Sequence, residues 1–363
     1  MGSRPQPSRR HVAPRIGCAV PVMRILAPLA LCCVLLGCVD TPEVITGPGG
    51  TSDRLSGLGF FVGDLAAQHP APGVVAYDVN VSLYADGAHK HRFVYVPAGQ
   101  TIHAREGRWD VPVGTVFIKT FYVPNDARDP TLGERLIETR FLVRTTDGYQ
   151  AATYLWNDAQ TDAVASGGNV EVPAEFVDAT GALVNRTFHV PGTSQCQSCH
   201  GGRALGWRSA QLDHPGAYPD GTTSQMAHLV AEGVVDAVPS ASIPLVDPFG
   251  TAPLDERARS YLDANCGHCH SAETGSEAAG THVDWDYEST VAASLPLCRP
   301  TFSINGRNHV IVPGRPDASE MLARMRATDP FARMPLGPSR VPDTEGMEVL
   351  SEWISAMSPA GCP

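Results

Sequence analysis

The fold of this chain is decided by residues 116–156, which read VFIKTFYVPNDARDPTLGERLIETRFLVRTTDGYQAATYLW. Three runs rich in β-branched and aromatic residues alternate here with polar turns: 116–123, 136–144 and 149–156. Runs of this length, bounded by Asp, Asn, Gly and Pro, are typical of β-strands joined by tight turns. The stretch therefore predicts consecutive antiparallel strands.

Strand-like runs continue on both sides of this stretch. Residues 74–79 and 91–96 precede it, and residues 182–190 follow it, each run separated from the next by turn residues. Many short strands with regular turns favour two packed antiparallel sheets. We therefore expect residues 54–192 to form an all-β, sandwich-like N-terminal domain.

The C-terminal third follows a helical period instead. Leu254, Ala258, Tyr261 and Leu262 fall on one helical face just after Pro253. Further helices are expected at a capping-box pattern over 317–320, at Asp343 or Thr344, and, earlier in the chain, over 224–232. The sequence therefore predicts a multidomain chain with an all-α domain over residues 251–363.

Composition limits the class of protein. The chain has 363 residues, of which 43% are hydrophobic and 18% charged, so it is globular and long enough for two domains. Its formal net charge is -11, although residues 1–37 contain five Arg and no acidic residue. Because the remaining chain is more acidic still, a nucleic-acid partner is excluded.

The N-terminus carries an export signal. Its apolar run, residues 25–36, follows a basic stretch and is too short to span a bilayer. The sequence Leu35-Leu36-Gly37-Cys38 resembles a bacterial lipobox, in which the cysteine is acylated and becomes the first residue. We expect a lipoprotein signal peptide over 1–37 and a polar, Pro/Gly-rich flexible tether over 38–53.

Lipidation at Cys38 predicts attachment to the lipid bilayer of the cell envelope. Val39 follows the cysteine in place of the Asp that retains lipoproteins at the inner membrane, which favours the outer membrane, facing the periplasm or the cell surface. The alternative is an ordinary signal-peptide end that happens to contain a cysteine.

Two copies of a C-x-x-C-H pattern carry the chemistry of the chain: Cys196-Gln197-Ser198-Cys199-His200 and Cys266-Gly267-His268-Cys269-His270. Two thiols at this spacing add across the vinyl groups of one porphyrin, and the following imidazole binds the iron. The sequence predicts two covalently attached haem c groups. Cys196, Cys199, Cys266 and Cys269 would bind the cofactors, and His200 and His270 would bind the metals. The first motif defines a haem-binding segment over 193–250, and the second makes residues 251–363 a cytochrome c-like domain.

Two other uses of these cysteines remain open. A zinc site could use all four, but free thiolates are poorly protected in an oxidising compartment, and zinc needs no His after each pair. Thiol–disulfide exchange at Cys266 and Cys269 would place the pair between a strand and a helix start, whereas the residues before it predict a helix.

Cys298 and Cys362 remain as an even pair in an exported chain. A disulfide that ties the C-terminal tail to the preceding domain is the simplest use of them. Two unrelated free thiols are the alternative.

Distal ligands are less clearly marked. Met334 precedes Pro335 in a loop, whereas Met321, Met325, Met347 and Met357 follow helical spacing, so we expect Met334 to bind the second iron. For the first iron, His228 on the predicted helix ranks before Met226 and His214. An open coordination position is the remaining alternative.

The chain resembles an uncharacterised bacterial family of di-haem c-type cytochromes with a β-rich N-terminal region. The stretches that carry the resemblance are the two haem motifs, 59–64, 77–80, 119–121, 154–158, 312–314 and Met334-Pro335. The resemblance implies electron transfer to redox partner proteins of the cell envelope, with no known substrate.

Three functional classes follow from these patterns. The first is a membrane-anchored electron carrier with two six-coordinate irons. The second is a di-haem peroxidase or oxidase, which needs one open iron site and a wider separation of the motifs. The third is a binding subunit whose β-rich domain docks a partner while the cytochrome delivers electrons.

Overall fold

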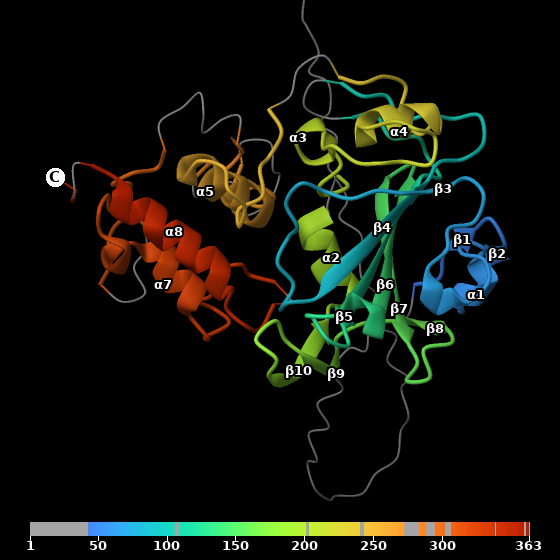
Figure 1. Cartoon of the computed structure of the whole chain (residues 1–363), viewed down its shortest axis with the longest axis horizontal. Helices are drawn as coiled ribbons and strands as arrows, with labels where there is room; N and C mark the ends of the chain where they lie inside the picture. Colours follow the sequence, from blue (N-terminus) through green and yellow to red (C-terminus); the bar gives the residue numbers. More distant parts are fainter. Residues whose placement is uncertain are drawn as a thin grey trace, which may run out of the picture. The chain divides into compact units, whose positions relative to one another are not determined.

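A six-stranded antiparallel sheet organises the part of the chain that the computed structural model describes: residues 43–105, 109–200, 203–239, 243–271, 283–287, 295–301, 306–337, 339–358 and 361–362, with all side chains except those of 197–199. Each strand pairs with the next along the chain (Figure 1). The strands are β3 (Val74–Ala76), β4 (His89–Tyr95), β5 (Val116–Pro124), β6 (Glu134–Thr145), β7 (Gly148–Trp156) and β8 (Ala163–Ser166).

The strand predictions are confirmed for β3 to β7. At the tight turn between β6 and β7, Thr145 pairs with Gly148, whose φ of 138° favours glycine at that position. Strand β8 was not predicted, because its four residues are too short a run to stand out from the turns around them.

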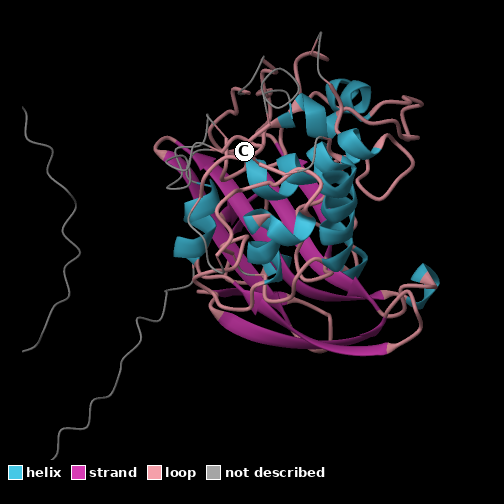
Figure 2. Cartoon of the chain, turned by 90° about the vertical axis from the view of Figure 1, so that its left-hand side faces the viewer, coloured by secondary structure: helices cyan, strands magenta, loops and turns pink. Residues whose placement is uncertain are grey.

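Alternation along the strands buries both faces of this sheet. Phe93, Ile118 and Phe141 lie on one face, in a core cluster that the N-terminal segment covers with helix α1 (Leu55–Leu58). The opposite face carries their chain neighbours Val94, Phe117 and Leu142. Residues between 196 and 235 cover this face. Figure 2 shows the strands in magenta and the helices and loops in cyan and pink.

The predicted β-sandwich is therefore wrong. Most of what packs on the sheet is helix and loop, and a two-stranded pair packs on Phe121, Val123 and Ile137. Among the described residues no second large sheet faces the first. The remaining strands form two separate antiparallel pairs, and a single bridge also links Val177 to Asp126. The pairs are β1 (Thr46–Gly47) with β2 (Gly50–Thr51), and β9 (Val170–Val177) with β10 (Leu183–Val190). The prediction over 182–190 corresponds to β10, and β9 was not predicted.

Short helices make up the rest of the regular structure. The first haem motif lies on α2 (Thr193–His200), followed by α3 (Ser209–Leu212) and α4 (Gln225–Ala231). The C-terminal part contains α5 (Leu254–Leu262), α7 (Glu320–Arg326) and α8 (Thr344–Ala356), whose inner faces share one core cluster. The described residues also contain single turns: η1 (Leu65–Ala67), η2 (Pro130–Leu132), η3 (Asp263–Gly267) and η5 (Pro316–Ala318).

The prediction of an all-α C-terminal domain is also wrong. Between α5 and α7, most of the described residues are non-helical, and isolated β-bridges pair Leu297 with Ile311 and Pro300 with His309. The carboxylate of Asp86 accepts hydrogen bonds from the backbone N–H groups of residues 340 and 341, so loops of the C-terminal part are bonded to the β-rich part. The helical period was detected correctly; the loops that join the helices carry no periodic signal.

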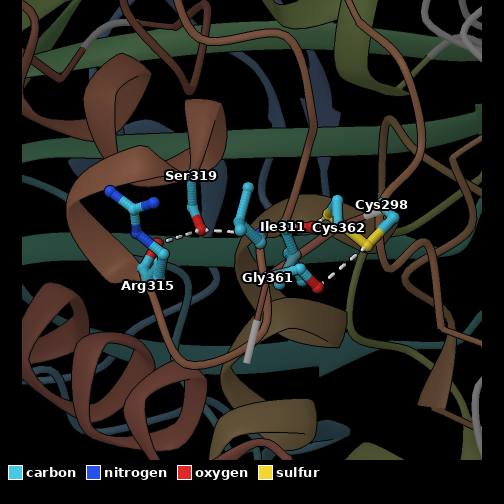
Figure 3. The surroundings of a disulfide bond; sticks show 7 residues. Cys298, Ile311, Arg315, Ser319, Gly361 and Cys362 are labelled. Atoms are coloured by element: carbon cyan, nitrogen blue, oxygen red, sulfur yellow. Dashed lines mark hydrogen bonds between the residues drawn. A yellow bond between two sulfur atoms is a disulfide. The ribbon is translucent and has the colours of Figure 1, made fainter. Parts of the chain in front are cut away.

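Cys298 and Cys362 form a disulfide, with their Cα atoms 5.3 Å apart (Figure 3). Backbone hydrogen bonds hold both ends in place: Cys298 N–H donates to Ile311 O at 2.8 Å, and Gly361 N–H donates to Pro313 O at 2.7 Å. The bond therefore ties the end of the chain to the segment that enters α7.

Replacing both Cys298 and Cys362 by Ser should lower the free energy of unfolding by about 4 kcal/mol, because the bond closes a loop with a sequence separation of 64. Denaturant unfolding of the variant and of the oxidised wild-type protein would measure the difference. Equal unfolding midpoints would contradict a stabilising role for this bond.

Candidate functional site

The first motif lies on α2, against the sheet. Cys196 is buried in the core cluster that also contains Phe117 of β5 and Leu229 of α4. The side chain of Cys199 lies outside the described residues. His200 is the last residue of this helix.

His200 is held as a neutral imidazole. Its burial, and next the charge of Lys119, lower its pKa to about 3. Its Nδ1 faces the carbonyl oxygen of Arg203 at 3.3 Å, and because a carbonyl only accepts, Nδ1 carries the proton. Nε2 then keeps its lone pair, which is the state in which a histidine binds a metal. The residue present fits a haem iron.

The second motif begins where α5 ends. Asp255 and Glu256 lie in the first turn of α5, where carboxylates stabilise a helix N-terminus, and the helix passes directly into the turn η3. The side chain of Asn265 fixes that turn, because it donates to Tyr261 O at 3.1 Å and accepts from Tyr84 N–H at 2.8 Å. The predicted helix leading into the motif is confirmed.

The backbone of His270 is bonded on both sides. Its N–H donates to Cys266 O at 2.8 Å, and its carbonyl accepts from Trp285 N–H at 2.8 Å. Burial lowers the pKa of His270 from its usual value, so its imidazole is also held neutral. Both predicted proximal ligands therefore have the protonation state that iron binding needs.

The surroundings of the cysteines disfavour their two other uses. Burial raises the pKa of the Cys266 thiol to about 12, whereas thiol exchange needs a lowered pKa. Cys196 and Cys266 belong to different core clusters. Among the described side chains, one group lies close enough together to share a metal ion: Asp220, His228 and Glu232. This group contains no cysteine.

The two motifs meet in space. The Arg203 guanidinium donates to the backbone carbonyl of His268 at 3.1 Å, which joins the residues just after the first motif to the middle of the second. Arg208 adds ion pairs to Asp263 and, at 3.2 Å, to Asp286. Sequence reasoning missed both arginines, because nothing in either motif shows that the other lies beside it.

Met334 lies in the loop after α7. Its N–H donates to Arg324 O at 3.1 Å, and its side chain is half-buried. The core cluster that contains Cys266 also contains the methionines at helical spacing: Met325 and Met347 are buried, and Met321 and Met357 are partly buried. Met334 is not part of this cluster. Met334 therefore lies in a loop and outside that core cluster, and its ligation of the second iron stays a prediction.

The three candidate distal ligands of the first haem have different surroundings. His228 contacts Asp220 Oδ2 through Nδ1 at 3.0 Å and stacks on Tyr218, with ring centroids 4.4 Å apart. Met226 is buried in the same core cluster as Cys196. His214 donates through Nδ1 to Pro215 O at 3.0 Å. Ligation of the first iron by His228 stays a prediction.

Cys38 lies outside the described residues, so its lipidation stays a prediction.

No family model, curated protein or solved structure matches this chain. The functional argument therefore rests on the two motifs and their surroundings.

Proposed function

We propose that this protein is a membrane-anchored di-haem c-type cytochrome that transfers electrons in the cell envelope. The observation that carries the proposal is the hydrogen bond from Arg203 to the carbonyl of His268. Because it places one C-x-x-C-H motif against the other, two haems attached there would lie close enough to exchange electrons.

The residues divide into two roles. Cys196, Cys199, Cys266 and Cys269 would attach the two porphyrins, and His200, His270, Met334 and His228 would bind the irons. When bound, each haem supplies a one-electron iron couple. The protein holds both imidazoles neutral and leaves both residues partly buried.

The distal ligands would set the direction of electron flow. A His/Met pair gives a higher potential than a His/His pair. With Met334 at the second site and His228 at the first, electrons would pass from the first haem to the second and then to a redox partner protein.

Carbon monoxide distinguishes this carrier from a peroxidase or oxidase. A six-coordinate ferrous haem resists the ligand, whereas an iron with an open position binds it and its absorption bands shift. We expect the spectrum of the reduced protein to remain unchanged under carbon monoxide. A shift in the absorption bands of one of the two haems would instead support a peroxidase or oxidase.

The Cys38→Ala variant should move from the membrane fraction to the soluble envelope fraction, because acyl chains on Cys38 are the proposed anchor. In the described part of the chain, every helix is too short or too polar to cross a bilayer. Fractionation followed by immunoblotting would measure the change. Continued sedimentation of the variant with membranes would contradict anchoring through Cys38.

A further inference from the structure

A row of cations crosses the sheet face on which the first motif lies. Arg92 of β4, Lys119 of β5 and Arg140 of β6 stand directly opposite one another in the strand register, so their side chains share one face. Lys90 lies two residues before Arg92 and therefore faces the same way. The full chain contains two lysines, Lys90 and Lys119, and its other basic side chains of this kind are arginines.

Carboxylates balance only part of this charge. Arg92 pairs with Asp78 at 2.5 Å, and Arg140 pairs with Glu138 at 2.5 Å. The two lysines instead contact carbonyl oxygens: Lys90 that of Leu83, and Lys119 that of Leu205 at 3.5 Å. Within the described residues, neither ammonium group forms an ion pair.

Leaving these ammonium groups without an anion is costly. Burial, and next the charge of Arg92, lower the pKa of Lys119 to about 7, and the same two causes lower the pKa of Lys90 well below its usual value. Like charges directly opposite each other on a sheet are destabilising, and desolvated charges normally have a partner. As whole residues, both lysines are only half-buried.

The row lies next to the first motif. Leu205, which contacts Lys119, follows His200 by five residues, and the charges of Lys119 and Arg140 both act on the His200 imidazole. A haem carries two propionate carboxylates, which matches two ammonium groups that lack a carboxylate. We infer that Lys119 and Lys90 bind the propionates of the haem attached to the first motif, an assignment that rests on the proposed function.

Redox titration of the full-length di-haem protein tests the assignment. A positive charge near an iron favours its ferrous state, so Lys119→Gln should lower one midpoint potential and leave the other unchanged. We expect roughly a tenfold shift in the ferrous-to-ferric ratio at fixed potential, which is about 59 mV for one electron. Lys90→Gln should lower the midpoint potential of the same haem. Lys119→Arg keeps the positive charge and should leave that potential at its wild-type value.

Arg135→Gln is the matched control, because Arg135 lies on the same sheet in an exposed pair with Asp158. It should leave both potentials unchanged. If both lysine variants keep two covalent haems and also keep both wild-type potentials, the propionate assignment is overturned. A wild-type protein without haem at the first motif would overturn the proposed function itself, and haem content separates these two outcomes.

A stability comparison covers the case in which Lys119→Gln folds poorly. In the di-haem protein, Lys119→Met should lower the unfolding midpoint, because the propionate loses its partner. In a background with Cys196 and Cys199 replaced by Ser, which lacks the first haem, the same change should raise it, because an unpaired cation is removed. An effect of the same sign in both backgrounds would overturn the assignment.

Discussion

We expect the Cys196→Ser and Cys266→Ser variants each to carry one covalently bound haem, where the proposed function gives the wild-type protein two. Each substitution removes one of the two thiols that would attach a porphyrin and so breaks the C-x-x-C-H pattern. Intact-mass measurement should show the loss of one haem, and the absorbance of the reduced pyridine complex per polypeptide should fall by half.

Cys298→Ser is the matched control, because this cysteine is bonded to Cys362 and lies outside both motifs. It should keep both haems and lose only stability. If Cys196→Ser and Cys266→Ser both retained two haems, the central proposal would be wrong. Loss of both haems from either single variant would show that the two attachment events depend on each other.

Local structure could be predicted well from the sequence, and the packing of its elements could not. The strands β3 to β7 and the helices α4, α5, α7 and α8 carry clear periods of two or 3.6 residues. Alternating residues such as Phe93 and Val94 show that both strand faces are buried, but they do not show what covers each face. A second sheet and a layer of helix and loop impose the same alternation, so the sandwich prediction failed.

The candidate site divides in the same way. The C-x-x-C-H spacing is local chemistry, which made His200 and His270 identifiable without a structure. The contact between Arg203 and His268 joins residues 65 positions apart, and no local pattern encodes it. The inference about Lys119 depends on the strand register, which places this residue between Arg92 and Arg140.

The Met334→His variant tests the second iron site. A neutral, soft thioether stabilises ferrous iron more than a second imidazole does, and it produces a weak near-infrared charge-transfer band in the oxidised protein. If Met334 is the distal ligand, the substitution should abolish that band and lower one of the two midpoint potentials. The other potential should stay nearly constant.

The fold should tolerate this change. The backbone of Met334 is bonded to Arg324 O through its N–H, which any residue other than Pro retains, and its side chain lies outside the core cluster around Cys266. Met325→Leu is the control, because Met325 is buried in that cluster, and its replacement should cost stability while leaving the band intact. An unchanged band and potential in Met334→His would mean that Met334 only packs. In that case the ligand would have to come from the helical methionines, which already fill the core between α5, α7 and α8.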